Sequence, residues 1–206
     1  PLPTVSITSD SPTCTGTSAT ITFTGTPDST VTFNYDSNPN ETILLNNLGT
    51  ANVITPILTS DSTYTLISIQ DSNSPSCSQS QTGSTTVIVN DAPIINTPTP
   101  YEVCDDNNDG KSCLFDLTTK INQITGGDPN VVVEFFETPT SGVAVSTNYC
   151  TLDPNSQILF VRAYFTGTPA CFSTTTLQLI VNPRPFANPT ITDYALCDYT
   201  NPGDGE

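Results

Sequence analysis

Short segments in which apolar and polar residues alternate constrain the fold of this chain most. In residues 30–35, for example, Val31, Phe33 and Tyr35 alternate with polar residues. Side chains of a β-strand point alternately to opposite faces, so this period predicts half-buried antiparallel strands. Seven such segments, parted by turn-forming residues, fall within residues 1–91: 4–8, 19–24, 30–35, 42–45, 51–54, 63–69 and 85–89. The pattern predicts an all-β fold, here an immunoglobulin-like β-sandwich.

A repeat divides the chain into tandem modules. Val87-Ile88-Val89-Asn90 is matched by Leu179-Ile180-Val181-Asn182, and each runs into a proline-rich stretch. Cys104-Asp105 is matched by Cys197-Asp198, each opening a new module. We therefore expect a first β-sandwich, a second β-sandwich, and a linker with the truncated start of a third repeat. Their bounds are residues 1–91, 92–184 and 185–206, and residues 90–100 should form a semi-rigid proline linker.

The second module is expected to carry one short helix. Leu117, Ile121 and Ile124 recur at helical spacing, Asp116 can cap the start, and Gly126-Gly127 can end the helix. Strands are expected at residues 131–137, 143–147, 158–165 and 174–181. The module thus adds a helix over residues 117–125 to a β-sandwich.

Composition narrows the possible partners. The chain has 20 acidic and 4 basic residues and a formal net charge of −16, which repels nucleic acid phosphates and anionic lipid and attracts divalent cations. Without His, the nucleophile pairs that use it are unavailable, and the acidic residues lie in turns rather than around an apolar pocket. We expect no catalytic residues and no enzyme.

The location expected from the sequence is extracellular. No apolar run is long enough to span a bilayer, so membrane insertion is not expected. The chain has no Met, so we expect Pro1 to be an interior point of a longer protein, with a processed terminus as the alternative. Seven cysteines in a Thr- and Ser-rich, Lys-poor chain indicate an oxidising compartment.

The cysteines predict disulfides inside each module. Cys14 and Cys77 are the only cysteines of the first module, which favours their pairing. Strand counting speaks against it, because simple up-down order places their loops at opposite ends of the sandwich. The second module allows three pairings, of which we favour Cys104–Cys171 and Cys113–Cys150. The partner of Cys197 is expected beyond the last residue.

The most specific chemical signal is the acidic stretch at residues 104–116. Oxygen donors, a glycine and a final carboxylate follow the spacing of an EF-hand calcium loop. The expected ligands are four side chains and one backbone carbonyl, from Asp105, Asn107, Asp109, Asp116 and Lys111 respectively. The alternative is a bare surface turn, since such residues also form ordinary turns and no helix precedes the loop. The spacing thus predicts a structural Ca²⁺ ion that stiffens the start of the second module.

Aromatic side chains suggest a possible binding surface. Phe136, Phe160 and Tyr164, with Arg162 among them, are placed to form an exposed strip that would serve as a ligand platform. The alternative is that the helix at residues 117–125 covers this face.

Several motifs of the second module resemble a repeat of very large cell-surface proteins of gliding Bacteroidota, exported by the type IX secretion system. They are residues 104–110, Phe115-Asp116-Leu117-Thr118, residues 133–138, Ala170-Cys171-Phe172 and residues 179–183. The first module is similar to the Ig/PKD-like repeats of the same proteins through Cys14-Thr15-Gly16, residues 21–27 and Thr63-Tyr64-Thr65-Leu66. This copy departs from the usual repeat by its extra pair Cys113 and Cys150.

The resemblance implies a surface adhesin, such as the filamentous adhesins of the gliding machinery. It also implies O-glycans on Ser29 and Ser62, because these bacteria glycosylate Asp-Ser/Thr followed by a small or apolar residue. We expect a structural and adhesive stalk segment at the cell surface. Its partners would be neighbouring repeats, surface or secretion machinery, and polysaccharide or substratum. A carbohydrate-binding module and an accessory domain of a secreted enzyme are the alternatives.

Overall fold

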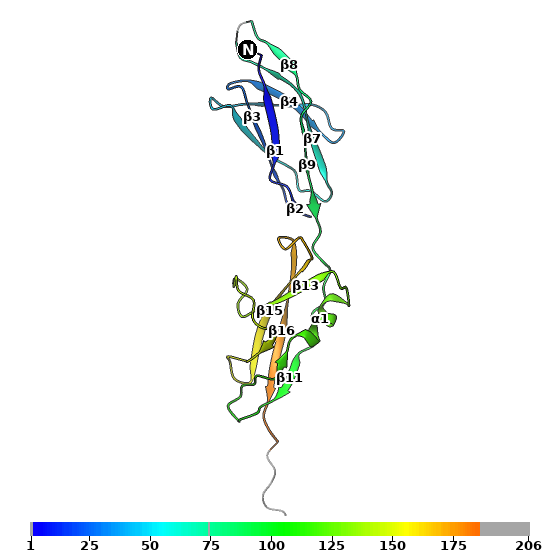
Figure 1. The fold of residues 1–206 in the computed structure, drawn as a ribbon, viewed down its shortest axis with the longest axis vertical. Coiled ribbons are helices and arrows are strands. Elements are labelled where there is room, and N and C mark those ends of the chain that lie inside the picture. Colours follow the sequence, from blue (N-terminus) through cyan, green and yellow to red (C-terminus); the bar gives the residue numbers. More distant parts are fainter. Residues whose placement is uncertain (1, 74, 186–206) are drawn as a thin grey trace, which may run out of the picture.

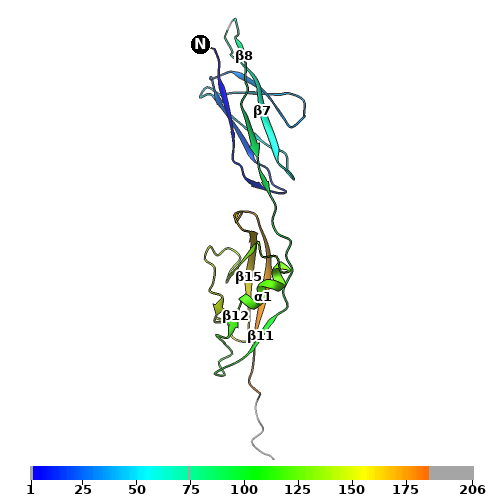
Figure 2. The same ribbon diagram turned by 45° about the vertical axis from the view of Figure 1, so that its right-hand side comes forward.

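Two modules lie end to end along the long axis of the molecule and are joined near residue 91 (Figures 1 and 2). A computed structural model describes residues 2–73 and 75–185. The predicted third repeat, including Cys197, falls on residues 186–206 and lies outside the described residues. The described chain is almost entirely β-structure with one short helix, which confirms the predicted fold class.

Module one is an immunoglobulin-like sandwich of two main sheets. One sheet has the order β1-β3-β6, the other β5-β4-β7-β8 with β9 also on β7, and β10 pairs in parallel with β2. The strands are β1 (Val5–Ser9), β2 (Thr13–Cys14), β3 (Thr20–Gly25), β4 (Thr30–Tyr35), β5 (Glu41–Leu44), β6 (Thr50–Ile54), β7 (Ser62–Gln70), β8 (Ser78–Ser80), β9 (Ser84–Val87) and β10 (Val89–Asn90). Each predicted segment is a strand, and the last is split into β9 and β10.

The core of module one follows the predicted alternation. Ile21 and Phe23 of β3 pack against Val31 and Phe33 of β4, and all four are almost fully buried. The Phe23 and Phe33 rings lie 4.8 Å apart between centroids. The threonines between these residues face outward, so the alternation of apolar and polar residues in the sequence matches the alternation of buried and outward-facing side chains.

Module two has a larger sheet, a two-stranded ribbon and the helix. The sheet has the order β11-β16-β15-β13, with β11 parallel to β16, and β12 pairs with β14. The elements are β11 (Tyr101–Cys104), β12 (Phe115–Asp116), α1 (Thr118–Thr125), β13 (Val131–Phe136), β14 (Asn148–Tyr149), β15 (Ser156–Phe165) and β16 (Phe172–Asn182).

The predicted helix is confirmed and one predicted strand is wrong. Asp116 accepts a hydrogen bond from the backbone N–H of Thr118 at 3.1 Å, and Gly126 ends α1 in the left-handed conformation at φ 66°. Residues 143–147 form no strand. The Val145 N–H donates to Phe135 O and Thr147 O accepts from the Leu117 N–H, both at 2.8 Å, but these isolated bonds make no continuous pairing. Val143 is 78% exposed.

The helix covers the face of the sheet opposite to the aromatic strip. Ile124 of α1 belongs to one core cluster with Leu159 and Val161 of β15. Phe160 and Arg162 alternate with these residues and therefore point to the other face. The alternative that α1 covers the aromatic strip is wrong, because the helix packs against the opposite face, which carries Leu159 and Val161.

Most of the predicted linker is part of module two. Pro93 and Pro98 are buried, and the Asn96 N–H donates to Ile124 O at 2.9 Å. The Lys120 ammonium of α1 donates to Thr99 O at 3.0 Å, which holds the segment against the helix. The chain between the two modules is thereby reduced to little more than residues 91–92.

The glycosylation prediction fails on burial. Ser29 is 0% and Ser62 3% exposed, and the Ser62 hydroxyl donates to the Asp36 carboxylate at 2.8 Å. A glycan on either hydroxyl would have no room in the folded module, so the glycans predicted on Ser29 and Ser62 are contradicted.

Candidate functional site at the module junction

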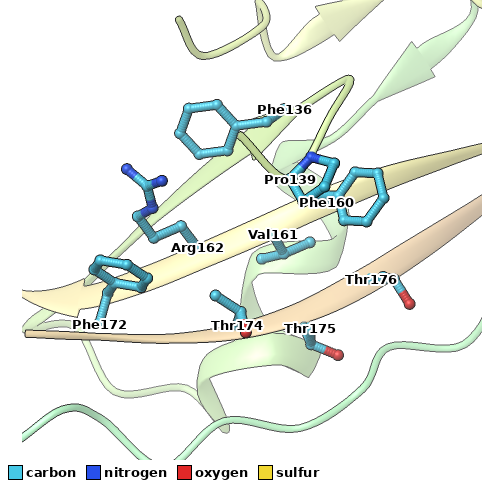
Figure 3. A pocket seen from close by; sticks show the side chains of 9 residues that line it. All are labelled: Phe136, Pro139, Phe160, Val161, Arg162, Phe172, Thr174, Thr175 and Thr176. Atoms are coloured by element: carbon cyan, nitrogen blue, oxygen red, sulfur yellow. The ribbon is translucent and has the colours of Figure 1, made fainter. Parts of the chain in front are cut away.

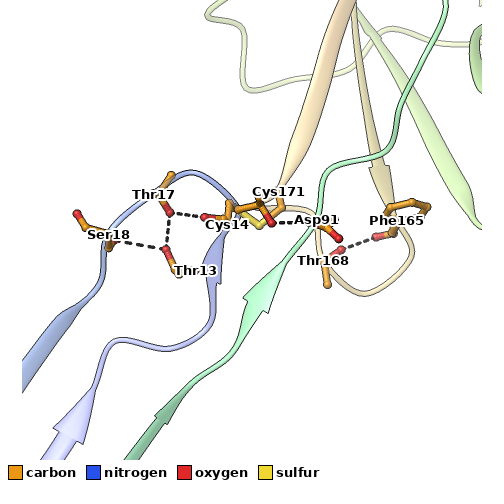
Figure 4. Close-up of a disulfide and its surroundings, with 9 residues drawn as sticks. Thr13, Cys14, Thr17, Ser18, Asp91, Phe165, Thr168 and Cys171 are labelled. Carbon is orange, nitrogen blue, oxygen red and sulfur yellow. Dashed lines mark hydrogen bonds between the residues drawn. A yellow bond between two sulfur atoms is a disulfide. The ribbon is translucent and has the colours of Figure 1, made fainter. Parts of the chain in front are cut away.

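A disulfide between Cys14 and Cys171 joins the two modules, with a Cα–Cα distance of 5.4 Å (Figure 4). The predicted pairs Cys14–Cys77 and Cys104–Cys171 are therefore wrong. The predicted bridge Cys113–Cys150 is confirmed. Cys77 and Cys104 are exposed free thiols.

Distance along the strands explains why both of those pairings fail. Cys14 ends β2 beside the junction, whereas Cys77 precedes β8 at the far end of module one (Figure 1). Cys104 lies opposite Asn182 at the end of β16, whereas Cys171 precedes its start. An 11-residue strand spans over about 30 Å, whereas disulfide Cα atoms lie within about 7 Å. The expectation from strand counting, that Cys14 and Cys77 lie at opposite ends of module one, is confirmed.

The backbone around Cys14 is held by β10. The Thr13 N–H donates to Ile88 O at 2.9 Å, and the Thr15 N–H donates to Asn90 O at 3.0 Å. The carbonyl of Cys14 accepts from the Thr17 N–H at 3.0 Å and from its hydroxyl at 2.6 Å. These bonds fix the turn that presents the Cys14 side chain to module two.

Cys171 is held by the tight connection between β15 and β16. Its N–H donates to Thr168 O at 3.1 Å, and the Thr168 N–H donates to Phe165 O at 3.0 Å. Gly167 supplies the positive φ of 93° that this turn requires. The Cys171 side chain is 3% exposed, so the bridge is sheltered on the module-two side.

Side-chain hydrogen bonds tie the disulfide and the connecting chain into a small ring. On one side the Thr15 hydroxyl donates to the Asp91 carboxylate, and on the other the Ser173 hydroxyl donates to Pro93 O at 2.5 Å. A hollow of about 680 Å³ lies beside this ring. Among the described residues, no strand pairing and no backbone hydrogen bond joins residues 1–90 directly to residues 101–182. The bridge is thus the second covalent connection between the modules.

The acidic loop is organised around the Asp105 carboxylate. This side chain is 5% exposed and accepts from the backbone N–H groups of Asn107, Asn108 and Gly110 at 3.1, 2.8 and 2.8 Å. Desolvation, the largest single influence, raises the pKa of Asp105, but these hydrogen bonds together outweigh it and leave the pKa below its usual value.

The predicted calcium ligands are only partly brought together. Asn107 accepts from the Asp109 N–H at 3.1 Å and Asp109 from the Lys111 N–H at 2.7 Å, so these residues share one turn with Asp105. Asp116 is engaged instead at the start of α1. No three His, Cys, Asp or Glu side chains within the described ranges converge as a metal site requires. The calcium site stays a prediction that rests on spacing.

A groove lies on the sheet face that α1 leaves uncovered (Figure 3). The Arg162 guanidinium carbon is 4.8 Å from the ring centroid of Phe136 and 4.5 Å from that of Phe172. Phe160 and Pro139 extend the groove, whose volume is about 310 Å³. Tyr164 lies on the same face beyond the groove, opposite Phe172 in the strand register. Sequence reasoning missed Phe172, which precedes the segment it predicted as a strand.

Comparison with known families agrees with this junction. Residues 100–185 match the sequence profile described as the Flavobacterium inter-domain disulphide bond domain. Module two is similar to that family. The matched range contains Cys171, the module-two half of the observed bridge. No protein with a curated description matches the chain. The disulfides and the match together indicate an extracellular protein of several domains, of a kind found in Bacteroidota.

No helix in the described part of the chain is both long enough and apolar enough to cross a bilayer.

Proposed function

We propose that this chain is a stalk segment of a large surface adhesin, in which the Cys14–Cys171 bridge fixes the junction between modules. The observation that carries the proposal is the bridge itself, placed where only residues 91–92 otherwise connect two separately folded units. Two modules joined by one short linker bend and twist freely unless their interface is large. A second covalent connection removes most of that freedom.

A fixed joint between modules supports a role in a surface adhesin. An adhesin must hold its binding end away from the cell and transmit tension, and a locked end-to-end array does both. The net charge of −16 keeps neighbouring stalks apart and soluble. The resemblance supports export by the type IX system and a role in gliding motility or surface attachment. The partners would be neighbouring repeats, the surface or secretion machinery, and a polysaccharide or other substratum.

Small-angle scattering tests the locked joint. The double variant Cys14→Ser/Cys171→Ser should fold both modules but show a broader distribution of maximum dimensions than the parent chain. The matched control Cys113→Ser/Cys150→Ser removes the bridge inside module two and should leave the distribution narrow. If opening the inter-module bridge leaves the distribution unchanged, the bridge does not set the joint and the proposal is wrong.

A second candidate function is ligand binding at the groove of module two. The supporting observation is the guanidinium of Arg162 held between two aromatic rings on an uncovered sheet face. Aromatic faces with a nearby hydrogen-bond donor are suited to sugar rings. Carbohydrate-array binding that is lost in Phe172→Ala but kept in Leu114→Ala, which removes an exposed apolar side chain outside the groove, would favour this function. No binding by the parent chain would exclude it.

A further inference from the structure

The two free cysteines of the described residues occupy positions equivalent to those of the two cysteines in the inter-module bridge. Cys77 and Cys104 are exposed, one at the far end of module one and the other at the far end of module two. Exposed thiols are unusual in an extracellular protein that already carries two disulfides.

Cys104 repeats the position of Cys14. Cys14 lies opposite Asn90 in the parallel pairing of β2 with β10, and Cys104 lies opposite Asn182 in the parallel pairing of β11 with β16. In both modules the residue after the cysteine donates its N–H to the carbonyl of that asparagine, at 3.0 Å in module one and 2.8 Å in module two. We call the end of a module where its last strand leaves it the exit. Cys104 therefore lies at the exit of module two, as Cys14 lies at the exit of module one.

Cys77 repeats the position of Cys171. Cys171 comes directly before β16, which pairs antiparallel with β15, and Cys77 comes directly before β8, which pairs antiparallel with β7. Each cysteine thus lies in the connection that leads from a long strand into the next strand, at the entry end of its module. Cys171 receives the bridge from the module before it, and Cys77 is placed to do the same.

The chain leaves the two modules in the same way. Asn90 and Asn182 are each followed, three residues later, by a proline, Pro93 and Pro185. At the first exit this proline is the buried start of the next module. The sequence after the second exit reaches Cys197-Asp198, which repeats Cys104-Asp105 but lies outside the described residues.

We propose that Cys104 and Cys77 are the open halves of two further inter-module disulfides. Cys104 pairs with the cysteine before the last strand of a following module of this fold, and Cys77 pairs with the exit cysteine of a preceding one. The proposal rests on the proposed stalk function and extends it from one locked joint to a series. Each bridge forms by thiol–disulfide exchange: a Cys thiolate attacks a protein disulfide oxidant, the partner thiolate displaces it, and the oxidant leaves as a dithiol carrying two electrons and two protons.

An added module supplies the missing partner of Cys104. The chain through Pro185 is followed by a second copy of residues 94–185, whose Thr176→Ser change marks its Cys171 peptide by mass. After oxidative refolding, alkylation and non-reducing digestion, the Cys104 peptide of the first copy should be linked to the marked Cys171 peptide. In the parent chain Cys104 should be alkylated. Placing a copy of residues 1–92 before Pro1 tests Cys77 in the same way, with Cys14 of the added copy as the expected partner.

The controls separate this proposal from the proposed function. A second copy carrying Cys171→Ser should leave the first Cys104 alkylated, and the Cys113–Cys150 link in each copy reports that both have folded. The Cys14–Cys171 link in the same digest reports the first junction, on which the stalk function depends. If that link is present while Cys104 stays alkylated beside a folded second copy, the series of bridges is wrong. If Cys104 links to the first Cys171, both proposals are overturned.

Discussion

Single residues in this chain act through backbone hydrogen bonds more than through charge pairs. Asp105 accepts three N–H groups of its own loop, and Asp116 accepts the first N–H of α1. Both carboxylates were predicted as metal ligands, and in the structure both accept hydrogen bonds from backbone N–H groups. The EF-hand spacing and the Asx-turn draw on the same residue types, so the sequence alone does not separate them.

The Asp105 carboxylate predicts a pH dependence. Because its folded pKa is depressed, its contribution to stability is present above the unfolded value, about 3.9, and is lost as the pH falls through the lower folded value. Urea unfolding of the parent chain and of Asp105→Asn between about pH 2 and 6 should show their stability difference shrinking toward low pH. A difference that does not change with pH would mean that the carboxylate charge contributes nothing.

Calcium binding remains a separate prediction for the same loop. If the loop binds Ca²⁺, chelated protein should gain thermal stability on titration with Ca²⁺ and give a calorimetric heat signal. Asp109→Asn should weaken both responses, because it removes a predicted ligand charge while the asparagine oxygen can still accept the Lys111 N–H. A melting temperature indifferent to Ca²⁺ would leave the loop as a turn.

At the scale of elements, short connections decide where the strands can meet. The turn between β5 and β6 approaches the end of β3 so closely that the Gly25 N–H donates to Gly49 O at 2.8 Å. A Cβ on Gly49 would lie 2.1 Å from Gly25 O, and its φ is +76°. Gly16 has a similar φ of +83° but open space where its Cβ would be.

These two glycines make a matched pair of variants. Gly16→Ala should cost about 1 kcal/mol, which is the strain of a left-handed alanine. Gly49→Ala should cost clearly more, because the strain is joined by a backbone clash that no side-chain rotation relieves. Chemical denaturation of module one measures both, and equal losses would contradict the close contact.

At the scale of the whole molecule, the inter-module bridge shortens the covalent path that carries tension between the two ends. β1 runs from the N-terminal end to the junction and β16 from the junction to the other end (Figure 1). The bridge connects the chain after the first to the chain before the second, with a sequence separation of 157. Tension on the two ends therefore passes through β1, Cys14, Cys171 and β16, and the residues between the two cysteines are removed from the extensible path.

Single-molecule stretching measures that hidden length. With the bridge intact, pulling from the ends should never release the residues between Cys14 and Cys171. In Cys14→Ser/Cys171→Ser, unfolding should add roughly 40 nm of contour, since each residue spans about 3.5 Å and the intact Cys113–Cys150 bridge still holds back 37 of the 157 residues. Cys113→Ser/Cys150→Ser should keep the short contour, because that bridge lies inside the protected part. Full extension of the intact protein would refute this route.

The sequence by itself determined the longer strands, the helix and the two modules, although it also predicted a strand at residues 143–147 that does not form. These depend on local periodicity, as in β4 and α1, and on turn residues such as Gly126. It did not reveal β2, β12 and β14, which are two residues long and carry no period. Only the tertiary structure decided the cysteine pairing, because a disulfide depends on which ends of the strands meet in space. Stacking two modules end to end brings Cys14 to Cys171 across 157 residues and leaves Cys77 out of reach.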